Sequence, residues 1–80
     1  MPLVFKEQGL RFYFYSNEGD PREPLHVHVT GGGRDAKLWL YPELEIAYNY
    51  GFTARELRVL LDIVQARRDE IESGWHDHFG

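Results

Sequence analysis

An 80-residue chain without cysteine has room for one small domain over residues 1–80, and it cannot use disulfides or thiolate zinc sites for stability. Its net charge of −4 argues against generic nucleic-acid binding, which needs excess Lys and Arg, and makes DNA an unexpected partner. The polar N-terminus, the lack of cysteine and the absence of any apolar run near the roughly 20 residues of a membrane span predict a cytoplasmic protein without signal peptide or membrane segment.

Two short strands are predicted at the start of the chain. They cover Val4 to Glu7 and Leu10 to Tyr15 and flank the turn residues Gln8 and Gly9. The loop Ser16 to Pro24 follows. Its many turn-forming residues, two prolines among them, exclude a helix there.

The next segment has the pattern of a β-hairpin. Leu25 to Thr30 predicts a third strand, and Ala36 to Tyr41 predicts a fourth. The three consecutive glycines at 31–33 lack the lysine and downstream helix of a phosphate-binding loop, so they are interpreted as the hairpin turn.

Residues 43–50 allow two interpretations. The alternation of Leu44, Ile46 and Tyr48 favours a fifth strand. A short helix over Glu43 to Tyr50 is the alternative, and the sequence leaves both open.

The C-terminal part of the chain predicts a long amphipathic helix. Thr53 followed by Glu56 has capping-box spacing, in which each side chain bonds the other residue's backbone N–H. From Ala54 onward the apolar residues recur at helical spacing: Leu57, Leu60, Leu61, Val64, Ile71 and Trp75. The predicted fold is therefore α+β, a small antiparallel sheet of four to five strands with one long C-terminal helix packed on one face.

Alternation along the strands separates two faces of the predicted sheet. The aliphatic and Phe positions are expected to form the core beneath the helix. One helix covers only one face, so the other is expected to meet solvent or a partner. That face collects Arg11, Tyr13, Tyr15, His26, His28, Lys37, Trp39 and Tyr41. Tyr, Trp and Arg are enriched in binding hot spots, whereas half-buried rings that pad a thin sheet are the alternative interpretation.

The strand histidines suggest acid–base chemistry. His26 and His28 point to the same side of a strand, and a histidine pair can serve as general acid and base in metal-independent RNA cleavage. Such a reaction also needs a cation to hold phosphate and a ring to stack a base. Arg11, Arg22 and Lys37 are the candidates for the cation. Tyr15 and Trp39 are the candidates for the stacking ring.

The same two histidines suggest a metal site as an alternative. Their side chains are about 6.6–6.8 Å apart along a strand, which allows a divalent metal if carboxylates join. Carboxylates of the neighbouring loop that could complete the site are Glu18, Asp20 and Glu23. A second pair, His76 and His78, would diverge on a helix and needs an unravelled end to bind metal. The spacing matches no specific metal signature, and no other cofactor is implied.

Several stretches of the chain resemble one bacterial family. RFYFYSNEGDPREPLHVHV, the hairpin ending KLWL, NYGFTARELRVLLDIV and the WHDHFG end are similar to the domain of unknown function 4160 over essentially the whole chain. The recurring motif comprises Tyr13, Tyr15, Asn17, Glu18, Gly19, His26 and His28. PLHVHV stands here where PPHVHV is the expected form, and the changed residue, Leu25, falls on the predicted core side.

The resemblance implies a stand-alone protein that is often encoded beside a second small protein of family 2442, a pairing that suggests a toxin–antitoxin system. It implies no activity, cofactor or catalytic residue. We therefore expect a protein-binding module whose aromatic and histidine face, with the loop residues Asn17, Glu18 and Arg22, binds the protein encoded alongside. The alternatives are a ribonuclease-type toxin that uses His26 and His28, and a metal-binding protein. Homo-oligomerisation and the choice between toxin and antitoxin stay open.

Overall fold

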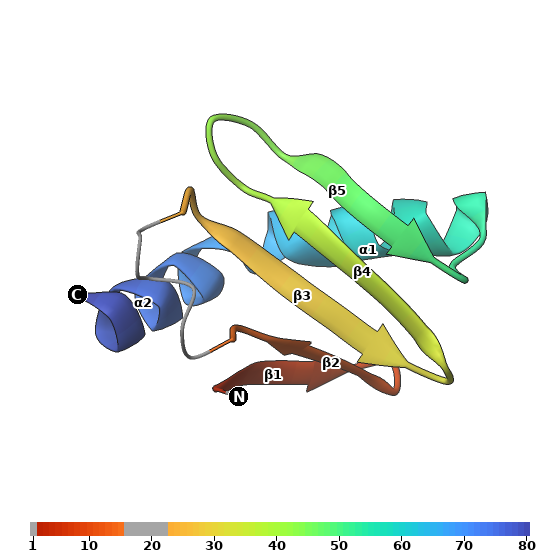
Figure 1. The fold of residues 1–80 in the computed structure, drawn as a ribbon, viewed down its shortest axis with the longest axis horizontal. Coiled ribbons are helices and arrows are strands. Elements are labelled where there is room, and N and C mark those ends of the chain that lie inside the picture. Colours follow the sequence, from red (N-terminus) through yellow and green to blue (C-terminus); the bar gives the residue numbers. More distant parts are fainter. Residues whose placement is uncertain (1, 16–22) are drawn as a thin grey trace.

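The computed structural model describes residues 2–15 and 23–80. Within them five strands precede two helices: β1 (Leu3–Glu7), β2 (Leu10–Tyr13), β3 (His26–Gly31), β4 (Arg34–Trp39), β5 (Glu45–Tyr50), α1 (Ala54–Ala66) and α2 (Arg68–Phe79). The strands form one antiparallel sheet in chain order (Figure 1). The predicted α+β class is confirmed, and residues 45–50 are a strand rather than the alternative helix.

Two predicted strands end early. β2 stops at Tyr13 rather than Tyr15, and β4 stops at Trp39 rather than Tyr41. Leu40 still donates its N–H to the carbonyl of Leu25 at 2.8 Å, one residue past the end of β4. Pro42 then follows, and a proline has no N–H to continue a ladder.

The prediction of one long C-terminal helix is wrong, because the helix is divided at Arg67. This residue has φ −111° and ψ 23°, outside the helical geometry of α1 and α2. Its guanidinium lies 3.6 Å from the centroid of the Phe5 ring and donates to Glu7 of β1 at 2.9 Å. These contacts join the bend to the sheet. The apolar periodicity of the sequence gave no indication of this bend, because both helices direct apolar residues toward the same core.

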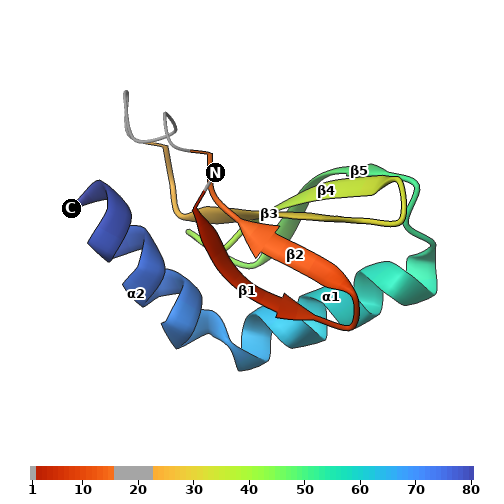
Figure 2. The same cartoon turned by 90° about the horizontal axis from the view of Figure 1, so that it is seen from below.

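The bend decides what the helices cover. Figure 2 shows α1 beneath the sheet and α2 rising along the end where β2 stops and β3 begins. The core between sheet and helices contains the strand positions expected from alternation, and its buried residues are Phe5, Leu10, Phe12, Phe14, Val27, Val29, Ala36, Leu38, Leu40, Phe52, Leu60, Ile63, Val64, Ile71 and Trp75. Neither helix of the described chain is long and apolar enough to cross a membrane.

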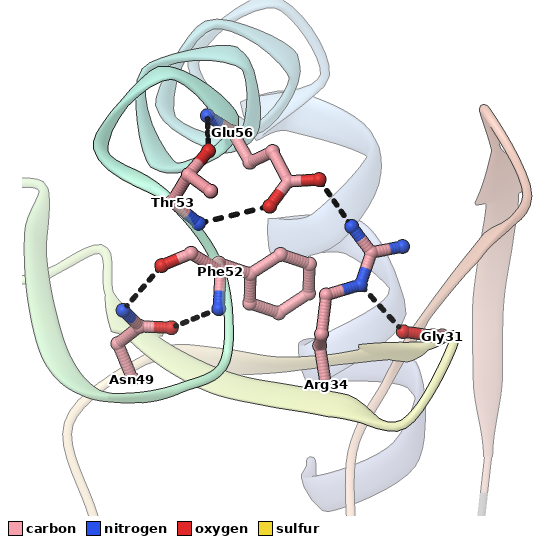
Figure 3. A network of polar contacts seen from close by, with 6 residues as sticks. All are labelled: Gly31, Arg34, Asn49, Phe52, Thr53 and Glu56. Carbon is pink, nitrogen blue, oxygen red and sulfur yellow. Dashed lines mark hydrogen bonds and ion pairs between the residues drawn. The ribbon is translucent and has the colours of Figure 1, made fainter.

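Local hydrogen bonds fix the start of α1. Thr53 Oγ1 accepts from the N–H of Glu56 at 3.1 Å, and Glu56 Oε1 accepts from the N–H of Thr53 at 2.8 Å, which confirms the predicted capping box. The Asn49 side chain accepts from the N–H of Phe52 at 3.1 Å and donates to its carbonyl at 3.0 Å (Figure 3). The turn from β5 into α1 is therefore closed by side chains.

Arg34 of β4 connects this turn to the hairpin. Its guanidinium forms an ion pair with Glu56, and its Nε donates to the carbonyl of Gly31 at 3.0 Å (Figure 3). The same group lies 4.9 Å from the centroid of the Phe52 ring. The end of β5, which carries part of the candidate site, is thereby held against β4 and α1.

We expect this network to make stability depend on acid pH. The hydrogen bond from the Thr53 backbone, and then the Arg34 cation, lower the pKa of the Glu56 carboxyl in the folded chain. A carboxyl whose folded pKa lies below its unfolded value of about 4.3 stabilises the fold above that value, and this stabilisation is lost as pH falls through the folded pKa. Glu56→Gln is therefore expected to lower the Tm at pH 7, by a difference that shrinks in acid.

The measurement is thermal unfolding followed by circular dichroism at a series of pH values. Glu43→Gln serves as the matched control, because Glu43 is exposed and lies outside the network. If the difference in Tm between wild type and Glu56→Gln stayed constant as the pH was lowered through the acid range, the assigned role of the carboxylate would be contradicted.

Candidate functional site

The face of the sheet turned away from α1 carries a continuous set of rings. We define the ring cluster as Tyr13, Tyr15, His26, His28, Trp39, Tyr48 and Tyr50. Neighbouring ring centroids within it lie 4.5–6.4 Å apart. Strand register explains the arrangement, because Tyr13, His28, Lys37 and Tyr48 stand opposite one another on four adjacent strands.

His28 lies at the centre of the ring cluster. Tyr13 stacks on it with centroids 5.5 Å apart, and Tyr15 meets it edge-on at 4.5 Å. Its Nδ1 lies 3.3 Å from the hydroxyl of Tyr48. These contacts leave only 3% of His28 exposed, so the expectation that this histidine meets solvent is wrong. Neighbouring rings shield one another on a face that no helix needs to cover.

His26 is buried at the end of the same face, with no exposed surface. Its Nδ1 donates to the carbonyl of Pro24 at 2.9 Å. Its ring meets Trp39 at 5.2 Å and Trp75 of α2 at 5.0 Å. Trp75 reaches this position because α2 rises along the end of the sheet. A single straight helix, as predicted, would not have supplied that cover.

The cations predicted for this face differ in their environment. Lys37 places its Nζ 4.2 Å from the centroid of the Trp39 ring and pairs with Glu23 at 3.2 Å. Arg11 is exposed on β2 and stands opposite Thr30, at the other end of the strands from His26. Lys37 therefore lies within the ring cluster, between His28 and Tyr48, whereas Arg11 borders its far side.

Tyr41 does not join the ring cluster, contrary to the prediction that it shares this face. It follows the end of β4 and is 63% exposed. It borders a separate hollow together with Leu25, Trp75 and His76. The early end of β4 accounts for the difference, because alternation of faces holds only while the chain stays extended.

Sequence reasoning missed Tyr48 and Tyr50 as members of this face. Leu38 pairs with Ile46 while Lys37 pairs with Tyr48, so β5 has one extra residue, Ala47, at a β-bulge. Residues two positions apart share a face on a regular strand. The bulge instead places Tyr48 on the opposite face from Ile46. The signal in the sequence was the pair of tyrosines at alternate positions, as in the Tyr13 and Tyr15 pair.

Two ionisable groups in or beside the ring cluster are buried, the side chain of Tyr13 and one carboxylate oxygen of Asp35. Burial, and then the hydroxyl of Tyr15, raise the pKa of Tyr13 far above its ordinary value, so the phenol stays neutral. Asp35 of β4 stands opposite Thr30 and Tyr50, and its Oδ1 is buried without a hydrogen-bond partner among the residues described. Sequence reasoning did not single out Asp35, because an aspartate after a glycine turn is common on hairpins.

The predicted metal site finds no support among residues 2–15 and 23–80. They contain no group of three or more His, Asp or Glu side chains that could hold a metal ion. Asp20 and the loop residues Asn17, Glu18 and Arg22 lie outside the described residues. His76 and His78 lie within α2, so the unravelled end that they would need is not observed.

Fold and site together define a small α+β domain with an aromatic and histidine cluster on the sheet face turned away from α1, where α2 covers only the end at His26. The chain belongs to the family described as domain of unknown function (DUF4160), whose model matches residues 9–76. The resemblance identified from the sequence is thereby confirmed, and the matched segment contains every residue of the ring cluster. No curated protein and no solved structure matches the chain.

Proposed function

We propose that the chain is a protein-binding module that engages a small partner encoded alongside it, as one member of a toxin–antitoxin-like pair. The observation that supports this proposal is the continuous ring cluster on the face turned away from α1. Its outer members remain accessible, since Tyr15 is 37% and Tyr50 is 67% exposed. Tyrosine and tryptophan are enriched in binding hot spots, because they contribute a large apolar area and a polar tip.

The construction of the face favours binding. Tyr13 and His28 are buried and in mutual contact, so the centre of the surface is rigid before any partner arrives. A preorganised surface loses less side-chain entropy on binding than a flexible one. The Lys37 cation lies over the Trp39 ring and is paired with Glu23, so its charge is balanced within the chain. We therefore expect the partner to present an apolar patch to the ring cluster.

The same geometry argues against the ribonuclease interpretation. A general acid or base must come within hydrogen-bond distance of its substrate. His26 is 0% and His28 is 3% exposed, and each already has a partner inside the chain, Pro24 and Tyr48 respectively. Catalysis by this pair would require the rings that cover it to open. No observation on the described residues favours that opening.

The first measurement is light scattering on the chain alone and after co-expression with the protein encoded beside it. A stable complex of the two chains is the expected result. A wild-type chain that stays monomeric in the presence of its neighbour would overturn the proposal, and RNA cleavage would be tested next.

Tyr50→Ala is expected to weaken the complex roughly tenfold or more, the effect of losing about 1.4 kcal/mol at a hot spot. The fold should be almost unaffected, because most of the Tyr50 ring is exposed. Isothermal titration calorimetry measures the affinity. Tyr41→Ala is the matched control, since Tyr41 is 63% exposed but lies outside the ring cluster. Equal losses for the two variants would contradict the assigned surface.

A further inference from the structure

A second surface lies between β1 and α2, next to the Tyr13 side of the ring cluster. The N-terminal half of β1 and α2 lie near each other (Figure 2). Between them is an open groove of about 550 Å³. Leu3, Val4 and Phe14 supply its apolar lining; Leu3 is 43% exposed, whereas Phe14 is buried. A lining of this kind suits an apolar side chain from outside the molecule.

The wall of the groove that α2 provides is acidic. Asp69, Glu70 and Asp77 line it, and no Lys or Arg does. Arg67 bonds both carboxylate oxygens of Glu70, at 2.9 and 3.0 Å. Among the described residues that line the groove, Asp69 and Asp77 are the exposed carboxylates that a partner would meet. A partner whose charge complements them is positively charged.

The spacing of the two aspartates indicates the conformation of that occupant. Asp77 lies eight positions after Asp69 on α2, a rise of about 12 Å. Residues four positions apart in an extended chain are about 13 Å apart and point to the same side. Two basic residues at such positions in an extended segment would reach both carboxylates together.

β1 offers backbone groups to such a segment. It is an edge strand of the described sheet, paired only with β2. Edge strands can pair with an added extended chain, the mode called β-augmentation. The Arg67 contacts with Phe5 and Glu7 occupy the C-terminal half of β1. The N-terminal half of β1, around Leu3 and Val4, borders the groove. We expect an added extended chain to pair with its backbone there.

Gly74 of α2 lines the groove and faces the sheet. A Cβ at this position would meet Phe14 and Val4 at 3.6–3.9 Å, which is ordinary contact. Internal packing therefore tolerates alanine here, and alanine is the stronger helix former. A methyl group at this position would occupy space beside two residues that line the groove.

We propose that this groove binds an extended, basic segment of a partner protein, with two Lys or Arg residues four positions apart and an apolar residue between them. The apolar residue rests on Leu3 and Val4, and the cations meet Asp69 and Asp77. The inference rests on the groove alone and does not depend on the ring cluster. Binding here and binding at the ring cluster are separable by variants of Asp69 and Asp77, because α2 carries no member of the ring cluster.

The test is a nuclear magnetic resonance titration of the full chain with the peptide Lys-Thr-Val-Thr-Lys, blocked at both ends, in which Val and both lysines share one side. Expected are chemical-shift changes at the amides of Leu3, Val4, Ser73 and Gly74, and much smaller ones with the Glu-Thr-Val-Thr-Glu counterpart. Shifts confined to other regions, equal shifts with both peptides, or groove shifts that depend on protein concentration without peptide would overturn the proposal. The last outcome would indicate a second copy of the chain as occupant.

Variants separate binding from folding. Asp69→Asn combined with Asp77→Asn is expected to weaken peptide binding roughly tenfold, whereas Asp62→Asn, an exposed carboxylate of α1, should leave it unchanged. Gly74→Ala is expected to raise the Tm by roughly 2–8 °C and to weaken binding at the same time. Wild-type affinity in the aspartate double variant, or a lower Tm for Gly74→Ala, would contradict the proposal.

Discussion

Trp75→Ala is expected to lower the Tm by at least about 12 °C and to leave the domain close to unfolding at 37 °C. Trp75 is 3% exposed, and its ring contacts Phe14 at 5.3 Å, Phe79 at 4.3 Å and His26 at 5.0 Å. Truncating a buried tryptophan costs about 3–5 kcal/mol, while a chain of this length has a total stability of roughly 4–12 kcal/mol. No disulfide compensates for the loss.

The measurement is urea denaturation followed by circular dichroism. Trp39→Ala is the matched control, because Trp39 is half-buried on the other face and lies outside the core. We expect it to cost clearly less than Trp75→Ala. Similar losses for the two tryptophans would show that α2 does not close the end of the core as described.

The second large effect concerns the histidines of β3. His26→Ala removes a ring packed between Trp39 and Trp75, and His28→Ala removes the ring at the centre of the cluster. Each is expected to destabilise the fold by about 2–3 kcal/mol, since buried truncations leave cavities. The double variant removes adjacent rings, so the two losses will not add simply. It is expected to be largely unfolded at 37 °C.

This expectation changes how a functional test must be designed. A double alanine variant that loses partner binding or any activity would report unfolding rather than catalysis. His28→Phe retains an aromatic ring but removes both ring nitrogens, so it keeps the packing and eliminates acid–base chemistry. A folded His28→Phe variant that retains function would exclude a catalytic role for His28.

The exposed histidine of α2 provides the control for the stability measurement. His76→Ala should change the free energy of unfolding by no more than about 0.5 kcal/mol, because His76 is exposed. Equilibrium unfolding of the three single variants gives the comparison. If His26→Ala proved as stable as His76→Ala, the burial of the strand histidines would not contribute to the fold.

Prediction from sequence succeeded where local rules act without interruption. β2, β3 and β4 are regular where they carry Phe12, Val27, Val29 and Leu38, so alternation placed these side chains in the core correctly. The capping box of Thr53 and Glu56 was predictable because it joins residues three positions apart. In both cases the physical cause lies within a few residues of its effect.

Prediction failed where one residue changes the direction of the chain. The extra residue Ala47 in β5 reverses which face Tyr48 occupies, and nothing in the alternation of Leu44, Ile46 and Tyr48 reveals it. A shift of one residue moves every following side chain to the other face of a strand. The members of the ring cluster on β5 were therefore known only once the strand register was known.

The sequence by itself determined the α+β class, the succession of strands along the chain, the core side of β2 to β4, the start of α1 and membership in the DUF4160 family. Only the tertiary structure decided that the helix bends at Arg67, that Trp75 and the tyrosine rings bury His26 and His28, and that a groove opens between β1 and α2. The reason is physical. Periodicity and capping are local properties of the chain, whereas burial depends on contacts between residues far apart in sequence, such as His26 and Trp75.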